Sequence, residues 1–223
     1  MKIFIYLIQF FIISLFLVLF KILGYRMASN FGGFIGSFFG QMFRSKKLIE
    51  GNIKKSLPKI SENEMEKIIK TMWSNYGRIL SDYVFIKNFR QSKLEKYLEI
   101  EGKEIFDEIK KNGEPVVFIS GHFNNFELMA MEIEKSGVSV AAIYRPLNNI
   151  FLNKIMESIR KKYICKHQIK KGISGIREIL QFCKKGFSIA LMIDQRVSEG
   201  IKSDLFGQPA LTTTIPAQLA KKF

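Results

Sequence analysis

Cysteine and histidine are scarce in this sequence, which has two of each among its 223 residues. Cys165 and Cys183 belong to no CxxC pair and no Cys/His cluster, which excludes the common zinc and dithiol redox motifs. Neither an HExxH metalloprotease signature nor a GxSxG nucleophile elbow is present. We interpret both cysteines as reduced structural thiols in a domain that faces the cytosol.

Acidic residues are also in short supply, because 20 Asp and Glu stand against 35 Lys and Arg, for a formal net charge of +15 at pH 7. Such a balance is typical of proteins that bind nucleic acid, an anionic membrane or an acidic partner. Hydrophobic residues, by contrast, make up 47% of the chain, and 21 of them are Phe. This is ample for one sizeable domain together with a membrane anchor.

The first uncharged segment, residues 3–20, helps to distinguish among these partners. Gln9 and Ser14 are its only clearly polar residues. At about 1.5 Å per residue the segment extends about 27 Å, close to the thickness of a bilayer's hydrocarbon core. A cleaved signal peptide is the alternative, but the apolar run is long and no convincing small-x-small cleavage site follows it. We therefore predict a retained membrane anchor over residues 1–23.

Positive charge follows the anchor. Between Lys21 and Ile60 lie eight basic residues and one acid, Glu50, whereas the N-terminal side offers only Lys2 and the amino terminus. The positive-inside rule then predicts a single-pass anchor with the rest of the chain in the cytoplasm. The same cations favour an anionic lipid surface, rather than nucleic acid, as the partner.

Residues 24–112 form a predicted helical, membrane-proximal region. Large apolar residues recur at helical spacing over 31–43, which predicts a helix that is either packed on the domain and partly in the membrane interface, or plainly buried. A second helix is predicted over 61–85, where Ser61 and Glu64 match a capping box, and a third over 103–111.

An α/β core is predicted from residue 113 to residue 223. Short apolar runs at 115–120, 138–144 and 187–193 have the composition of buried strands, and they alternate with helical patterns at 125–136, 151–163 and 174–185. This order predicts an α/β fold with a largely parallel central sheet flanked by helices. The pattern at 215–223 is that of a helix without a stop signal, so we expect the core to be C-terminally incomplete.

Polar loops follow all three predicted strands, at the edge where open α/β sheets bind ligands. His122 leaves the first strand, and Glu127 falls in the first turn of the next helix. This spacing suits a general base with a carboxylate on its imidazole. The alternative is structural, because Asn124 and Glu127 could form a capping-box-like pair and leave His122 as an ordinary loop residue.

The other two loops supply candidate substrate contacts. Arg145 directly follows the second strand and suits a bidentate phosphate contact, although pairing with a carboxylate on the rim fits its position equally well. The polar run 194–196 follows the third strand and could orient a head group. His167 follows no strand end, so we interpret it as a surface or structural residue. The turn-rich segment 206–216 either walls a pocket or forms a surface loop.

Residues Gly121-His-Phe-x-x-Phe-Glu127 resemble the HX4D/E motif of the lysophospholipid acyltransferase superfamily. The blocks that follow are similar to one branch of it, the lipid A biosynthesis acyltransferases that add secondary lauroyl or myristoyl chains. These blocks are Tyr144–Leu147, Asp194–Gln195 and Phe206–Ala210, with further similarity at 52–58, 73–78 and 101–102. The Glu in the motif, and Asp-Gln-Arg where glycerolipid enzymes have Pro-Glu-Gly, favour this branch.

The resemblance implies an O-acyltransferase of the bacterial inner membrane that moves a fatty acyl group from acyl carrier protein to a hydroxyl of a lipid A precursor. His122 would be the general base, Glu127 would orient it, and Arg145 would bind a phosphate or stabilise the transition state. No metal and no organic cofactor is implied. Further candidate substrate-binding residues are Asn124, Asn125, Tyr144, Asp194, Gln195 and Arg196.

Two other functions stay open from the sequence. The acceptor could be another lipid, such as a lysophospholipid, a glycolipid or an ornithine lipid, because the shape of the pocket determines the acceptor. The chain could instead be a catalytically inactive, membrane-tethered lipid-binding homologue, although the presence of His122, Glu127 and Arg145 argues against a decayed site.

Overall fold

The computed structural model describes all 223 residues, and the chain falls into two compact units. One unit, the α/β unit, comprises residues 1–13, 86–195 and 213–223. The other, the helical unit, comprises residues 14–85 and 196–212. Helix α1 (Lys2–Leu23) contributes its first half to the α/β unit and its second half to the helical unit.

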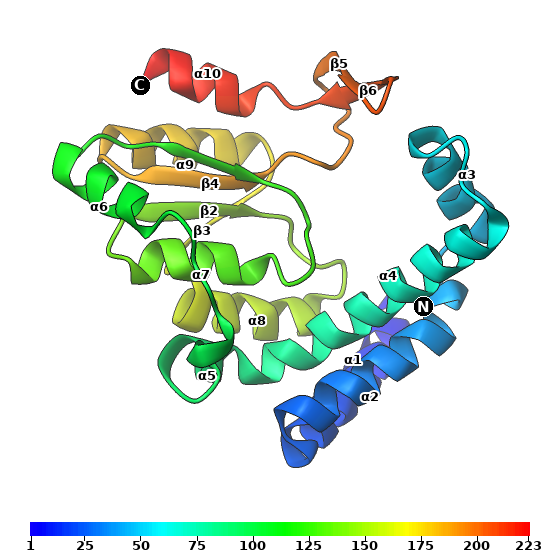
Figure 1. Ribbon diagram of the computed structural model, residues 1–223. Coiled ribbons are helices and arrows are strands. Elements are labelled where there is room, and N and C mark those ends of the chain that lie inside the picture. Colours follow the sequence, from blue (N-terminus) through cyan, green and yellow to red (C-terminus); the bar gives the residue numbers. More distant parts are fainter. The chain divides into compact units, whose positions relative to one another are not determined.

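The α/β unit is built on a four-stranded sheet. Its strands lie in the spatial order β1 (Val117–Ser120), β4 (Ser188–Met192), β2 (Val140–Tyr144) and β3 (His167–Lys170), and every pairing is parallel. Figure 1 shows helices on both faces: α9 (Ile173–Lys184) and α10 (Ile215–Lys222) on one, α7 (Glu127–Lys135) and α8 (Ile150–Ile159) on the other. The predicted α/β fold with a parallel sheet is confirmed.

Shorter elements complete the α/β unit. One hydrophobic cluster of its core lies between the sheet, α9 and α10, around Ala141, Ile179 and Leu219. The unit also contains α5 (Ile86–Gln91), the 3₁₀ turn Glu95–Tyr97, α6 (Lys103–Asn112) and a π-helical turn at Arg160–Ile164. Cys165 and Cys183 are both buried and free. Burial raises the pKa of Cys165 to about 11, which keeps this thiol protonated and agrees with the interpretation of a structural residue.

The three strands predicted from apolar runs are present, each within two residues of its expected start. Two further features were not predicted. Strand β3 is an edge strand in which only Ile169 is buried, so its composition lacks the apolar run of the other strands. The segment 206–216, expected to be turn-rich, contains the turn and the second strand of an antiparallel hairpin of β5 (Ile201–Leu205) and β6 (Gln208–Thr212), and every residue of β5 is exposed.

The helical unit contains α2 (Tyr25–Phe39), the 3₁₀ turn Gly40–Phe43, α3 (Lys46–Ser56), α4 (Glu62–Asp82), the 3₁₀ turn Tyr83–Phe85 and the β5–β6 hairpin. The capping box predicted at the start of α4 is confirmed. Ser61 Oγ accepts a hydrogen bond from Glu64 N, and the Glu64 carboxylate accepts one from Ser61 N.

Glycines on α2 and α4 let the two helices approach to backbone contact. A Cβ atom added at Gly77 of α4 would lie 1.9 Å from the carbonyl oxygen of Gly32, and one added at Gly36 would lie 2.2 Å from that of Trp73. The opposite side of α2 is therefore turned away from α4, and there Phe34 is 64% and Phe38 66% exposed. The alternative that this helix is plainly buried is wrong.

We predict that Gly77→Ala destabilises the protein by about 1–3 kcal/mol, the usual cost of overpacking, because the new methyl group overlaps backbone rather than a movable side chain. Gly51→Ala in α3 is the matched control. It has open space around its Cβ position, and we expect it to be neutral or stabilising by up to about 1 kcal/mol. Denaturant unfolding of both variants checks the prediction, and equal stabilities would contradict the close approach of α2 and α4.

Candidate active site

Two neighbouring strands deliver His122 and Asp194 to the same edge of the sheet. Strands β1 and β4 pair in parallel, with Ser120 opposite Met192. His122 and Asp194 each lie two residues beyond this last paired position. The carboxyl ends of parallel strands meet at one edge of a sheet, so the register brings the imidazole and the carboxylate together.

Asp194 holds His122 with both carboxylate oxygens. Asp194 Oδ2 accepts a hydrogen bond from the main-chain N–H of His122 at 2.8 Å, and Oδ1 lies 2.7 Å from the ring Nδ1. The main-chain bond fixes the loop while the ring bond fixes the imidazole. With Nδ1–H donating to Asp194, the Nε2 atom carries the lone pair that a general base needs.

The surroundings of the pair leave this nitrogen accessible. The His122 side chain is 29% exposed, and the amide nitrogen of Gln195 lies 3.3 Å from Nε2, so Gln195 donates in this tautomer. The ring of Phe126 meets the imidazole edge-on at a centroid distance of 4.6 Å. A hydroxyl group that displaces Gln195 would find the lone pair of Nε2 directed at its proton.

The pKa of Asp194 is lowered from its ordinary value. Partial burial alone raises this pKa, but the hydrogen bonds from the His122 main chain and ring, with the charge of the ring, outweigh it. The carboxylate is therefore ionised at neutral pH, and it is able to stabilise an imidazolium as the proton arrives on His122.

Glu127 pairs with Arg160. It is the first residue of α7 and is 6% exposed, and its Oε1 accepts hydrogen bonds from Arg160 Nε at 3.0 Å and from Arg160 Nη2. Arg160 is itself buried, and its guanidinium lies over the ring of Tyr144 at 5.4 Å from the centroid. The pair ties α7 to the π-helical turn after α8.

The sequence-based hypothesis placed the Glu127 carboxylate on the imidazole, whereas it is Asp194 Oδ1 that lies 2.7 Å from the ring Nδ1. The capping alternative is wrong, because Phe126 occupies the N-cap position of α7 without a side-chain cap and Asn124 has a φ of 41°. Arg160 was not singled out from the sequence. No sequence signal distinguished it, because Arg160 is the first of three consecutive basic residues and is followed directly by Lys161 and Lys162.

The other predicted contacts lie at the same edge or beside it. Arg145 follows β2, the neighbour of β4, and is exposed. Asn124 is exposed and Asn125 half-buried in the loop after β1, whereas Arg196 is exposed and belongs to the helical unit.

Of the predicted site residues, the structure brings His122, Asp194 and Gln195 into contact. Arg145 lies at the same carboxyl edge, directly after β2. His167 packs edge-on against Phe187, which agrees with a structural role.

Tyr144, predicted as a substrate contact, donates its hydroxyl to Glu157 Oε1 at 2.5 Å. This bond is the largest cause that lowers the pKa of Glu157 to about 2, with further help from Asn153 and Lys170. Since the folded pKa lies below the ordinary value of 4.5, the stability that Glu157 contributes is present above pH 4.5 and is lost as the pH falls toward 2.

Tyr144→Phe is expected to cost about 0.5–1.5 kcal/mol at neutral pH, because one hydrogen bond to a carboxylate disappears. It should also raise the pKa of Glu157, so that less stability is lost between pH 4.5 and 2. Urea unfolding of the wild type and the variant at several pH values measures both effects. An unchanged pH dependence would contradict the hydrogen bond.

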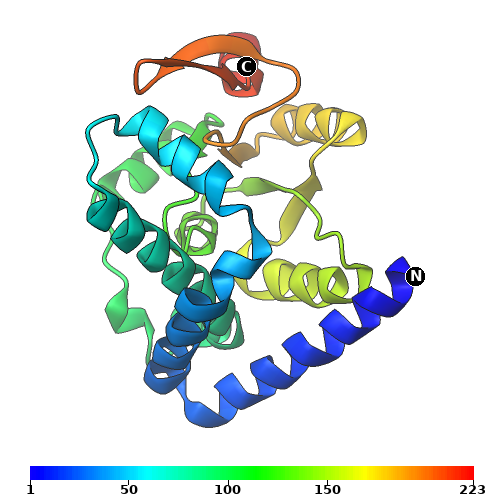
Figure 2. The ribbon, with the colours of Figure 1, turned by 90° about the vertical axis from the view of Figure 1, so that its right-hand side faces the viewer.

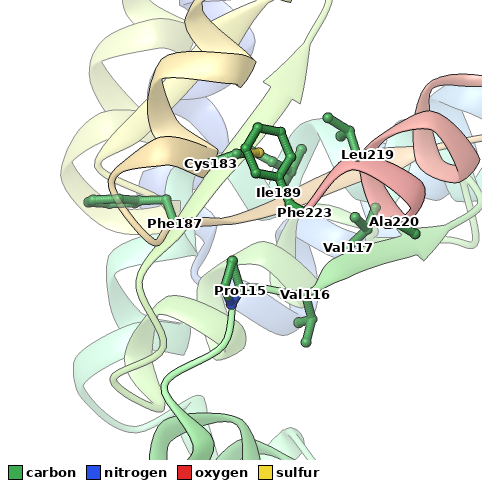
Figure 3. Close-up of a pocket in the computed structure, with 9 residues that line it drawn as sticks. All are labelled: Pro115, Val116, Val117, Cys183, Phe187, Ile189, Leu219, Ala220 and Phe223. Carbon is green, nitrogen blue, oxygen red and sulfur yellow. The ribbon is translucent and has the colours of Figure 1, made fainter.

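An apolar cavity of about 350 Å³ lies at the opposite end of the sheet (Figure 3). Its walls include Pro115 and Val117 at the start of β1, Cys183 of α9, and Leu219 and Phe223 at the end of the chain. His122 follows the other end of β1, so this cavity does not belong to the His122–Asp194 site. No group of three or more His, Cys, Asp and Glu side chains is arranged to hold a metal ion.

Comparisons with known proteins match the whole chain to one family. The model of a family described as "Bacterial lipid A biosynthesis acyltransferase" matches residues 1–223. Among curated proteins, the chain is similar to the "Lipid A biosynthesis myristoyltransferase" of Escherichia coli (strain K12), with 23% identity over 159 residues, which are 71% of this chain and 48% of that protein. It is also similar to the "Lipid A biosynthesis acyltransferase 2" of Shigella flexneri, with 23% identity over 69% of this chain and 48% of that protein. The match thus spans about half the length of these relatives.

Proposed function

The chain belongs to the bacterial lipid A biosynthesis acyltransferase family, and on this premise we propose that it transfers a fatty acyl group to a hydroxyl of a lipid A precursor. The observation that carries the proposal is the contact between His122 Nδ1 and Asp194 at the carboxyl edge of the sheet, which leaves Nε2 available as a base. The relatives described above, a lipid A biosynthesis myristoyltransferase and a lipid A biosynthesis acyltransferase, support this proposal.

The proposed reaction is attack of the acceptor hydroxyl on a thioester. As the oxygen approaches the carbonyl carbon, its proton moves to His122 Nε2 and a new C–O bond forms. The tetrahedral intermediate then loses the thiolate, the C–S bond breaks, and the imidazolium returns its proton to the sulfur. Asp194 stays ionised throughout and stabilises the imidazolium, as the lowered pKa of its carboxyl allows.

We propose that the donor is an acyl thioester of acyl carrier protein and that the acceptor hydroxyl is the 3-hydroxyl of an acyl chain already on the precursor. A formal net charge of +15 suits an acidic carrier protein. The exposed Arg145 at the same sheet edge is our candidate for a phosphate of the acceptor. Glu127 then contributes through Arg160, as a positioning residue that holds α7 and the loop before it.

Membrane attachment supports a lipid acceptor. Helix α1 is 22 residues long and apolar enough to cross a bilayer. We propose the cytoplasmic face of the bacterial inner membrane as the site of action, because seven basic residues from Arg26 to Lys59 follow α1 and favour the anionic surface of that leaflet. By length and composition alone, α1 would allow the single crossing predicted from the sequence.

A comparison of lipid extracts tests the acceptor. Deletion of the gene should remove one secondary acyl chain from lipid A, and the loss should be seen by mass spectrometry. The wild-type gene should restore the chain, and the His122→Ala gene should not. If lipid A is unchanged and an acyl chain is missing instead from the product of a lysophospholipid, a glycolipid or an ornithine lipid, the acceptor is that other lipid. No lipid change at all would contradict it.

A further inference from the structure

The first half of α1 is bound to the α/β unit by a polar side chain. Asn149 Nδ2 donates to the main-chain carbonyl of Tyr6 at 2.8 Å and to Gln9 Oε1 at 3.2 Å. Asn149 is 6% exposed, and its Oδ1 accepts from the main-chain nitrogens of Phe151 and Leu152, so it also caps the start of α8. Figure 2 shows the N-terminus of α1 beside α8.

Apolar contacts accompany these hydrogen bonds. The rings of Phe10 and Phe151 lie 5.9 Å apart, and residues 1–13 belong to the same compact unit as α8. Gln9 is one of only two clearly polar residues in the apolar run, and its side chain is used in this contact. The structure therefore accounts for the amide in the middle of an otherwise hydrophobic segment.

A crossing helix is difficult to reconcile with these contacts. Tyr6 lies about 25 Å along α1 from Leu23, at about 1.5 Å per residue. If Leu23 were at the cytoplasmic surface and Tyr6 near the far surface, α8 would have to follow Tyr6 through the hydrocarbon core. Lys154 of α8 and Arg145 before it are exposed charges, which are costly at that depth.

The exposed side of α1 forms a continuous apolar stripe along its whole length. Its residues recur at intervals of four and three, and each of them is 44% or more exposed: Phe4, Ile8, Phe11, Leu15, Val18 and Ile22. Tyr6, Phe10, Ile13, Leu17 and Phe20 on the other side are buried or half-buried. The contacts of α1 with the α/β unit are thus made by the side that carries Tyr6, Gln9 and Phe10, while the stripe on the other side is apolar and exposed.

We infer that α1 does not cross the bilayer but lies along its cytoplasmic surface, with the stripe from Phe4 to Ile22 in the lipid and Asn149 holding the N-terminal half on the α/β unit. A surface helix in membrane proteins carries a polar face toward water. Here Asn149 and Phe151 of the α/β unit contact the side that carries Tyr6, Gln9 and Phe10. The basic residues after Lys21 serve as lipid contacts in this arrangement, so the charge asymmetry of the sequence fits it as well as a crossing.

Anionic lipid is the expected occupant of the stripe because α1 is followed directly by cations. Arg26, Arg44, Lys46 and Lys47 come after it and are exposed. The exposed Phe34 and Phe38 of α2, which begins two residues after α1 ends, add apolar surface in the same stretch of chain. The inference rests on the proposed membrane attachment, but not on acyl transfer.

Cysteine labelling in membranes tests the topology. Cys165 and Cys183 are buried, so a single new cysteine reports its own position. One chain carries a cysteine in a short neutral peptide ahead of Met1, and a matched control carries Ile105→Cys, an exposed residue of α6 in the α/β unit. Each is treated with a membrane-impermeant maleimide in intact spheroplasts and in inverted inner-membrane vesicles.

We expect both cysteines to be labelled in inverted vesicles and neither in spheroplasts. Labelling of the N-terminal cysteine in spheroplasts, with Ile105→Cys protected there, would show a crossing and overturn the inference. Labelling of both in spheroplasts would keep α1 on one side but contradict the proposed cytoplasmic face. These outcomes are read without any assay of transferase activity, so a failure of the proposed function is seen separately.

Depth measurements provide the second test. Phe4→Cys, Leu15→Cys and Ile22→Cys are labelled with a fluorophore in vesicles of zwitterionic and anionic phospholipid that carry shallow or deep nitroxide lipids. An in-plane helix predicts stronger quenching by the shallow nitroxide at all three positions. Strongest quenching of Leu15→Cys by the deep nitroxide would indicate a crossing, and absence of quenching at all three would indicate a protein cover. Either result overturns the inference.

The contact between Asn149 and α1 can be tested with a single substitution. Asn149→Asp keeps the oxygen that caps α8 but removes the amide donor to Tyr6 and Gln9. We expect hydrogen exchange of the amides in residues 6–10 to become faster, while that of α8 stays unchanged. Equal exchange of residues 6–10 in the wild type and the variant would contradict the role assigned to Asn149.

Discussion

His122→Ala should reduce acyl transfer by roughly 10²- to 10⁴-fold, the usual contribution of a general base. In the proposed mechanism the imidazole receives the proton of the attacking hydroxyl, and its Nδ1 is held at 2.7 Å from Asp194 Oδ1. Stability should change little, because the side chain is 29% exposed and lies in a loop. Initial rates of transfer and thermal unfolding of the same preparations measure the two effects.

His167→Ala is the matched control for this prediction. It removes the other histidine of the chain, which packs against Phe182 and Phe187. We expect a loss of stability with near-normal turnover of the folded fraction. Asp194→Asn should keep the loop folded but lower the rate, because a neutral amide does not stabilise the imidazolium. Full activity of His122→Ala would exclude its assignment as the base.

Glu127→Ala is expected to destabilise the protein by about 3–5 kcal/mol, because it leaves the buried guanidinium of Arg160 without its carboxylate. This effect is large compared with the 5–15 kcal/mol that separates typical folded and unfolded states. Urea unfolding in a mild detergent measures it. The loss of activity at a permissive temperature should follow the loss of folded protein.

A double variant separates the structural role of Glu127 from a direct role at His122. Glu127→Ala with Arg160→Met removes both charges, so it should be more stable than Glu127→Ala alone. If Glu127 acts instead by directing the imidazole, Glu127→Gln should fold with normal stability and lose activity, and the Arg160 variant should not compensate. That pattern would favour the pairing expected from the sequence.

The strand pattern explains how much of this site was predictable. Three continuous apolar runs identified the strands and therefore the loops that carry His122, Arg145 and Asp194. Apolar runs do not predict the spatial order of the strands in the sheet. Asp194 reaches His122 because β4 lies next to β1 in the sheet. Glu127 is nearer to His122 in the sequence, and for this reason the sequence favoured Glu127 as the partner of the imidazole.

The elements that escaped prediction share weak or ambiguous apolar patterns. Strand β3 has one buried residue, Ile169, and its neighbours are polar. The β5–β6 hairpin is exposed along β5, so no burial pattern marks it. Helix α1 was predicted from its apolar run, but composition alone does not distinguish lipid on all sides from protein on one side and lipid on the other.

Acyl transfer by the purified chain in lipid vesicles tests the central claim most directly. The donor is a panel of acyl thioesters of acyl carrier protein, the acceptor is a lipid A precursor, and the product is identified by mass spectrometry. We predict one new ester on a hydroxyl of the precursor with the wild type, and its near-complete loss with both His122→Ala and Asp194→Asn. No transfer by the folded wild type, or equal transfer by the wild type and His122→Ala, would contradict the account.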